Sequence, residues 1–150
     1  MNFIIPSREL LNRLIEMGGL ISNKPALPVL ENFLFDIKDN TLTIYSTDME
    51  TSMVSSLSVE ASEDIKFAIP GKMLQDVLRS LPDQPLTFKV DPTSFRVEVI
   101  RDNSDYKIAG TSSDDYPKMQ EKIVDNAIKI PANILSRAIT KTAFATSSDE

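Results

Sequence analysis

One short segment occurs three times in this chain of 150 residues, at spacings of 64 and 61 residues. In each copy, an apolar residue and one variable residue precede Ile-Pro, and the prolines are Pro6, Pro70 and Pro131. A segment that recurs at a nearly fixed period indicates one supersecondary unit copied along the chain. The repetition therefore constrains the fold more than any other feature, because such units bury their apolar faces against one another.

Each copy predicts a short strand that ends at its proline and an amphipathic helix that begins there. Proline has a fixed φ, and its missing N–H is no loss in the first turn of a helix. Aliphatic residues stand four and eight positions after each proline, on one face of the helix that we expect to be buried. These residues are Leu10 and Leu14, Leu74 and Leu78, and Leu135 and Ile139.

The opposite face of each predicted helix is polar and mildly basic. Counted over the three copies, it holds five basic and two acidic side chains, the basic ones being Arg8, Lys72, Arg79, Arg137 and Lys141. An ordinary solvated helix face has the same composition. Equivalent helices in equivalent units can, however, line one surface, and a basic surface of this kind suits the phosphate backbone of DNA.

Three strand-like runs follow each of the first two helices. They cover residues 32–38, 41–47 and 50–59 in the first copy, and 86–90, 95–101 and 105–111 in the second. Asp39-Asn40 is typical of a tight hairpin turn. Two βαβββ repeats, 1–63 and 64–122, thus predict an α+β domain with two helices over antiparallel sheet. Residues 112–126 are polar, and we interpret them as a linker.

The third copy predicts the beginning of a second domain. We assign residues 123–150 to the linker and to the first strand and helix of that domain. One strand and one helix cannot bury their own apolar faces, so we expect this part of the chain to lack its packing partners.

Composition excludes several classes of function. The chain has no Cys and no His, which removes thiolate nucleophiles, disulfides and the commonest general base and metal ligand. No apolar stretch approaches the roughly 20 residues that cross a bilayer, and no signal peptide is evident, so we expect a cytoplasmic protein. The net charge of −6 opposes DNA binding unless acids and bases lie on different surfaces.

Two further hypotheses come from other features of the sequence. The first is a metal-dependent nuclease or phosphatase that uses the chain's neighbouring acids, namely Asp36, Asp39, Asp48, Glu50, Asp114 and Asp115. The second is a protein-interaction module, because the run with Tyr106, Lys107 and Ile108 would offer free backbone groups if it formed a sheet edge. We favour a third interpretation, a non-enzymatic protein whose helices face DNA, and for it we predict no metal and no cofactor.

Several motifs together resemble one family. They are Lys24-Pro25-Ala26-Leu27-Pro28-Val29-Leu30, Thr47-Asp48-Met49-Glu50, Ile69-Pro70-Gly71-Lys72 and Asp114-Asp115-Tyr116-Pro117. In this order they are similar to the bacterial sliding clamps, the beta subunits of the replicative DNA polymerase. The resemblance covers the whole chain. It implies a DNA clamp fold in which helices line the inner face of antiparallel sheets, and a homodimeric ring that encircles double-stranded DNA and tethers the polymerase.

The resemblance also implies roles for particular residues. Lys24 occupies the place of a basic loop residue that touches duplex DNA, and Lys72, Arg137 and Lys141 lie on helices expected to face the central hole. The strand with Tyr106 and Ile108 would pair with the third domain of the partner protomer. The family's second DNA-contacting loop would fall at residues 147–150, which are acidic here. The polymerase alpha subunit and the clamp loader would bind later domains, which this chain lacks.

Overall fold

The computed structural model describes residues 1–21, 27–101, 104–118 and 128–146. The chain divides into two compact units, Met1–Met119 and Gln120–Glu150. The predicted domain boundary at residue 122 lies outside the described residues. Among the described residues, none of the helices has the length and apolar character needed to cross a bilayer.

The first unit consists of two copies of the same order of elements, as the repeats predicted. The first copy comprises β1 (Asn2–Pro6), α1 (Ser7–Met17), β2 (Asn32–Lys38), β3 (Thr41–Thr47), β4 (Ser52–Ser58) and β5 (Glu60–Ala61). The second comprises β6 (Ile65–Pro70), α2 (Gly71–Ser80), β7 (Pro85–Val90), β8 (Arg96–Arg101), β9 (Ser104–Ala109) and β10 (Thr111–Ser112). Short 3-10 turns cover Gly18–Leu20, Pro28–Glu31 and Ser113–Asp115.

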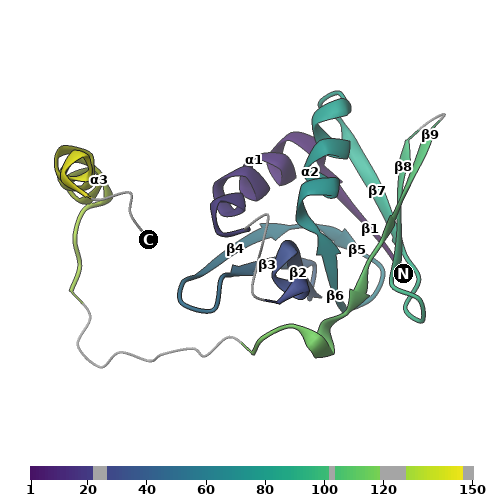
Figure 1. Ribbon diagram of the computed structural model, residues 1–150. Coiled ribbons are helices and arrows are strands. Elements are labelled where there is room, and N and C mark those ends of the chain that lie inside the picture. Colours follow the sequence, from purple (N-terminus) through teal and green to yellow (C-terminus); the bar gives the residue numbers. More distant parts are fainter. Residues whose placement is uncertain (22–26, 102–103, 119–127, 147–150) are drawn as a thin grey trace. The chain divides into compact units, whose positions relative to one another are not determined.

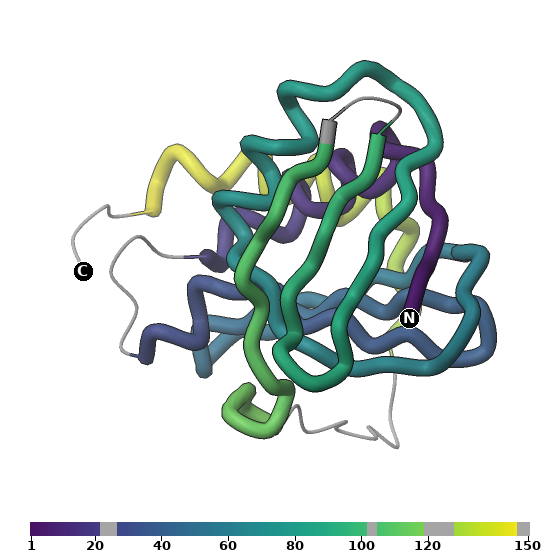
Figure 2. The backbone as a smooth tube through the Cα atoms, turned by 90° about the vertical axis from the view of Figure 1, so that its right-hand side faces the viewer, coloured from purple at the N-terminus to yellow at the C-terminus, as the bar shows by residue number. Residues whose placement is uncertain are grey.

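The two repeats exchange strands. Sheet A has the order β5-β1-β7-β8-β9, and sheet B has the order β10-β6-β2-β3-β4. The leading strand of each repeat therefore pairs with the first strand after the other repeat's helix, with Pro6 opposite Pro85 and Asn32 opposite Pro70. Figure 2 shows the strands of sheet A side by side, with β9 at one edge. Each sheet therefore contains strands from both repeats.

Both helices lie on one side of the unit, above sheet B and beside sheet A (Figure 1). They are antiparallel, since Ser7 at the start of α1 donates its side-chain hydrogen bond to Pro82 beyond the end of α2. Farther along α1, the Leu14 carbonyl accepts a hydrogen bond from Gln75 of α2. Pro6 and Pro70 are the last residues of their strands and precede the first helical residues, Ser7 and Gly71.

One hydrophobic core joins the helices to both sheets. The predicted faces of α1 and α2 are confirmed, because Leu10, Leu14, Leu74 and Leu78 are all at most 1% exposed. Aromatic side chains from both repeats fill the centre, where the rings of Phe3 and Phe88 stack with centroids 4.8 Å apart. The alternating pattern of the strands thus provides the sheet faces that cover the helices.

Turn residues explain where the strands begin and end. Asp39 and Asn40 have φ values of 48° and 58°, the left-handed pair that a two-residue hairpin requires, which confirms the predicted turn. The predicted run at 50–59 was too long, because residues 48–51 form a turn and β4 begins at Ser52. The single run predicted at residues 105–111 forms two strands, because Gly110 separates β9 in sheet A from β10 in sheet B.

The interpretation of residues 112–126 as a linker was wrong at its start. Ser112 belongs to β10, and Tyr116 is only 4% exposed. The Tyr116 ring packs against Leu34 and Ala68, and its hydroxyl lies 3.4 Å from the carbonyl oxygens of Asn32 and Tyr45. The first unit therefore extends through this aromatic anchor, beyond the last long strand.

The second unit, described over residues 128–146, contains α3 (Ala132–Thr142) followed by a 3-10 turn at Ala143–Ala145. The helix was predicted, but no strand forms at residues 128–131. A strand needs a pairing partner, and β1 and β6 each pair over most of their length with a strand of the other repeat. The expected burial of Leu135 and Ile139 is also wrong for this structure, since they are 47% and 57% exposed. These exposures agree with the expectation that a lone copy cannot bury its apolar face.

Candidate nucleic-acid interface

The helices are less acidic than the rest of the chain. Of its 16 basic and 22 acidic side chains, α1, α2 and α3 hold six and three, which leaves ten and nineteen for the remainder. The three helices therefore carry a net charge of +3, and the remainder of the chain carries −9. Basic side chains are thus concentrated on the helices and acidic ones elsewhere, so an acidic protein can still attract the phosphates of DNA to its helices.

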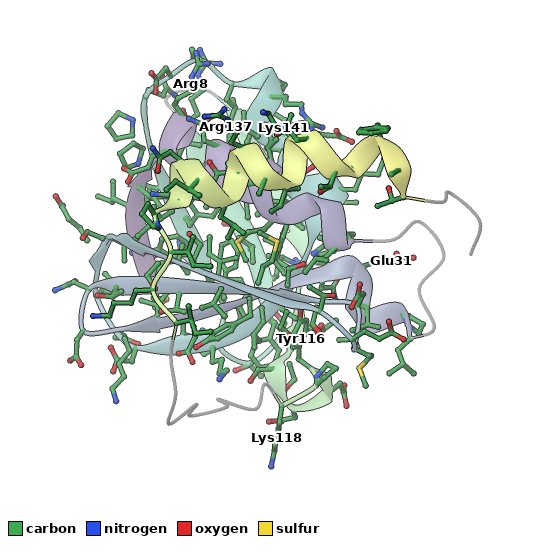
Figure 3. All side chains as sticks on the ribbon, turned by 90° about the vertical axis from the view of Figure 1, so that its left-hand side faces the viewer. Arg8, Glu31, Tyr116, Lys118, Arg137 and Lys141 are labelled. Atoms are coloured by element: carbon green, nitrogen blue, oxygen red, sulfur yellow. The ribbon has the colours of Figure 1, made fainter. Side chains whose placement is uncertain are left out.

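Arg8 and Arg79 lie close together although 71 positions separate them. Because the helices are antiparallel, the first turn of α1 meets the last turn of α2. Both arginines line one small hollow of about 160 Å³, together with Ser7, Leu11, Leu78, Leu81 and Asp83. Figure 3 shows Arg8 on the helix side of the unit, whereas Tyr116 lies on the far side of sheet B. We call the exposed side of α1 and α2 that carries Arg8, Lys72 and Arg79 the helix surface.

Nearby carboxylates accompany both arginines. Arg8 Nε lies 3.9 Å from Asp83 Oδ2, and an Arg79 terminal nitrogen lies 3.0 Å from Asp76 Oδ1. A further pair on α1 joins Arg13 to Glu16 at 3.5 Å. The helix surface is therefore a pattern of alternating charges rather than a continuous basic patch, and its attraction for phosphate is weak.

The other predicted DNA-binding residues fall in different parts of the molecule. Lys72 is exposed at the start of α2, on the outer face that it shares with Arg79. Arg137 and Lys141 are exposed on α3 and extend from the same side of that helix (Figure 3). Lys24 and the acidic residues 147–150 lie outside the described residues.

A second candidate surface lies where α2 faces β9, the edge strand of sheet A. A groove of about 540 Å³ is lined by Glu31, Pro70, Lys72, Met73, Asp76, Val77, Ser80 and Tyr106, and we call it the α2–β9 groove. Its apolar side chains include Met73, which is 52% exposed. An edge strand beside an exposed apolar side chain has the features of a site for another protein chain.

The structure separates the three residues predicted for that interface. Tyr106 lines the groove, and Lys107 is exposed and lies 3.8 Å from Glu98 of the neighbouring strand. Ile108 is 1% exposed, because its side chain belongs to the core. Only the backbone of Ile108 is therefore free to contribute to a contact between chains.

Three of the six acids proposed for a metal-dependent enzyme have other partners. Asp36 forms an ion pair of 2.9 Å with Lys66, and Asp114 accepts a hydrogen bond from Ser112. Asp48 accepts hydrogen bonds from the backbone N–H groups of Thr51 and Glu50, which lower the pKa of its carboxyl group. Within the described residues, no three His, Cys, Asp or Glu side chains come together in a group that could hold a metal ion.

Sequence reasoning missed three features of these surfaces. Met73 and Val77 line the groove, Asp76 and Asp83 accompany the arginines, and Tyr116 anchors the end of the first unit. The apolar side chains on the outer part of α2 were the available signal for the groove. The approach of Asp83 to Arg8 had no signal, because it depends on how the two repeats pack.

A protein-family model described as the DNA polymerase III beta subunit, N-terminal domain, matches residues 1–120. A beta sliding clamp from Haemophilus influenzae is 34% identical over 149 residues, which cover 97% of this chain and 40% of the relative. A beta sliding clamp from Vibrio harveyi is 29% identical over 147 residues, covering 97% of this chain and 100% of that sequence. This chain thus spans less than half of the Haemophilus relative.

Solved structures are similar over the whole chain. A sliding clamp, DNA polymerase III subunit beta, from Pseudomonas aeruginosa bound to griselimycin has a TM-score of 0.90 and 26% identity; the match covers 100% of this chain and 41% of that one. A DNA polymerase sliding clamp from Bacillus subtilis has a TM-score of 0.91 at 19% identity, with the same coverage, and shares the fold.

Proposed function

This chain belongs to the family of bacterial DNA polymerase III beta subunits through its N-terminal domain, and on that premise we propose that it is part of a sliding clamp. The complete protein is a ring that encircles duplex DNA in the cytoplasm and tethers the replicative polymerase. It catalyses no step itself and acts as a processivity factor. The proposal rests on the similarity to beta sliding clamps, which extends over 97% of this chain.

The distribution of charge supports the DNA-encircling role. A protein that must move along any sequence needs attraction to phosphate without base-specific contacts. The three helices together carry a net positive charge in an acidic chain, and Arg8 and Arg79 line one hollow. We assign Arg8, Lys72, Arg79, Arg137 and Lys141 to the DNA-facing surface, and Lys24 to a loop contact with duplex DNA.

Ring closure requires a second protomer. We assign to it the edge strand β9 and the apolar part of the α2–β9 groove, with Met73 and Tyr106, and leave Lys72 and Asp76 of the same groove on the helix surface. The edge strand β9 offers unpaired backbone groups, and Tyr106 and Met73 offer apolar contact beside it. Lys107 and the backbone of Ile108 belong to the same strand. We assign contacts with the polymerase alpha subunit and the clamp loader to the portion of a clamp that this chain does not span.

Retention on circular DNA tests the proposed function. The native full-length protein is loaded onto a nicked circular plasmid, washed at high salt and then treated with an enzyme that linearises the plasmid. Salt screens phosphate contacts but cannot open a closed ring. Retention on the circle followed by release on cutting is the expected result. Equal loss from circular and linear DNA would contradict topological linkage.

A further inference from the structure

The fold brings Asp83 next to Arg8 on the helix surface. Asp83 lies in the segment between α2 and β7, which Ser7 fastens on both sides. The Ser7 hydroxyl donates to Pro82 O at 3.0 Å and accepts from Gln84 N at 3.1 Å, while Ser7 N donates to Gln84 O at 2.9 Å. Ser7 is itself buried, at 3% exposure. The backbone on both sides of Asp83 is thus fixed at the first turn of α1, and the Asp83 carboxylate lies 3.9 Å from Arg8 Nε.

Arg79 is held by two neighbours on its own helix. Asp76 Oδ1 accepts a hydrogen bond from one terminal nitrogen of the guanidinium at 3.0 Å, and the side-chain oxygen Oε1 of Gln75 accepts one from the other at 3.3 Å. The Gln75 side chain is held in turn, because its nitrogen Nε2 donates a hydrogen bond to Leu14 O of α1 at 2.7 Å. The guanidinium therefore has a defined position between a charged and a neutral acceptor.

From this arrangement we infer that Asp76 and Asp83 are built-in counter-ions that weaken the hold of Arg79 and Arg8 on DNA, so that the ring moves along the duplex with little friction. The inference rests on the proposed function and deepens it, because it names residues that set the strength of the DNA contact. It requires no additional ligand.

The physical reason lies in the balance between attraction and movement. Each phosphate that a protein neutralises releases counterions, and the logarithm of the binding constant then falls with the logarithm of salt concentration by about 0.9 per contact. A ring that is linked topologically to DNA does not need these contacts to stay bound. An arginine already paired with a carboxylate gains less from a phosphate, and it releases the phosphate more readily.

The pairs are exposed, which makes them suitable for substitution. The side chains of Arg8 and Asp83 are 67% and 59% exposed, and those of Arg79 and Asp76 are 50% and 58% exposed. Exposed ion pairs contribute little to folding stability. Asp76→Asn and Asp83→Asn keep the size of each side chain and remove only its charge, so we expect both variants to fold.

The matched control removes a carboxylate from the other side of the protein. Asp36 pairs with Lys66 at 2.9 Å on the face of sheet B that points away from the core. Asp36→Asn raises the net charge by one, as Asp76→Asn and Asp83→Asn do. It also frees Lys66 from its ion pair, but away from the helix surface. Any effect of overall charge will therefore appear in the control as well.

The experiment measures binding of the full-length variants to a short linear duplex over a series of salt concentrations. For each protomer of the ring, we expect the salt slope to steepen by about one for Asp83→Asn, by about one for Asp76→Asn and by about two for the double variant. Asp36→Asn should keep the wild-type slope. Single-molecule tracking of loaded rings should show slower one-dimensional diffusion for the double variant.

A fifth variant links the effect to Arg8. Adding Arg8→Gln to Asp83→Asn should return the slope to the wild-type value if Arg8 makes the new contact. An unchanged slope in both single variants, or an equal change in Asp36→Asn, would overturn the inference. Retention of the wild-type protein on circular DNA is scored separately, so the proposed function and this inference can fail independently of each other.

Discussion

Asp48 illustrates how the use of a single carboxylate depends on the local backbone. In the sequence it stands beside Glu50 and resembles a candidate metal ligand. In the structure it accepts hydrogen bonds from Thr51 N at 2.6 Å and Glu50 N at 3.0 Å, and Met49 between them takes a φ of 83°. The carboxylate therefore holds the turn between β3 and β4.

This use of Asp48 predicts a dependence of stability on pH. The hydrogen bonds from Thr51 and Glu50 lower the pKa of the folded-state carboxyl group below its unfolded value of about 4. Its stabilising contribution is then present above that unfolded value and is lost as pH falls through the folded pKa. We expect Asp48→Ala to lower the unfolding midpoint at pH 7, and the deficit to shrink in acid.

Denaturant unfolding of the wild type and Asp48→Ala between pH 7 and pH 2 measures this dependence. Glu50→Ala, which removes the exposed acid next to the turn, is the control and should change the midpoint little. A deficit for Asp48→Ala that remains constant over the whole range would show that the ionised carboxylate does not stabilise the turn.

Tyr116 predicts a different kind of residue effect. Burial of the side chain raises its pKa to about 12, so the hydroxyl stays neutral and can donate to a backbone carbonyl. We expect Tyr116→Ala to cost about 3 kcal/mol because it leaves a cavity against Leu34 and Ala68. Tyr116→Phe keeps the ring, and should cost about 1 kcal/mol or less because its hydrogen-bond distances are long.

Native-state hydrogen exchange of the β2 and β6 amides measures these two costs where the Tyr116 ring packs. Faster exchange in Tyr116→Ala than in Tyr116→Phe is the expected order. Equal protection in the two variants would mean that the ring does not hold the end of the first unit to sheet B.

At the scale of elements, the start of α2 is limited by space. A Cβ atom at Gly71 would meet carbon atoms of the Phe33 ring at 3.0 and 3.1 Å and would come closer still to the terminal methyl group of Ile21. Both neighbours pack in the core. We expect Gly71→Ala to lower the free energy of unfolding by about 1 to 3 kcal/mol through overpacking.

Gly19→Ala is the matched control for Gly71→Ala. No atom lies within 4 Å of a Cβ built at Gly19, so the same substitution there should be neutral or stabilising by about 0.5 kcal/mol. Urea unfolding of both variants makes the comparison. Equal midpoints for the two variants would contradict close packing at the start of α2.

The elements that local patterns specify were predicted well. The bounds of β2 and β3 agree with the predicted runs, since alternating apolar residues and the Asp39-Asn40 turn define both. The exchange of β1 and β6 between repeats was not predicted, because pairing between distant strands leaves no local signal. The absent strand at residues 128–131 has the same cause, as an apolar run becomes a strand only beside a partner.

At the scale of the whole molecule, the repeat accounts for much of the candidate site. It placed Arg8, Lys72 and Arg79 on the outer faces of two equivalent helices, and the structure brings these helices together. It could not place Asp83 beside Arg8, which depends on the segment that Ser7 fastens. The α2–β9 groove likewise arises only where the edge of sheet A meets α2.

The groove leads to a prediction about the assembled protein. Met73→Glu would place a carboxylate among apolar side chains and close to Glu31 and Asp76, which line the same groove. If a second protomer covers the groove, that charge loses water without gaining a partner. We expect a loss of about 2 kcal/mol in dimer affinity, equivalent to a dissociation constant raised about thirty-fold.

Sedimentation of the full-length protein over a dilution series measures this change. Ile15→Glu is the control, because Ile15 lies on α1 with a similar exposure, 49% against 52% for Met73. At high salt, the Ile15 variant should still be retained on a nicked circular plasmid, since retention depends on ring closure and not on phosphate contacts. The Met73 variant should be lost from the plasmid at protein concentrations where its dimer dissociates. A Met73→Glu protein that dimerises like the wild type would show that the ring closes through another surface.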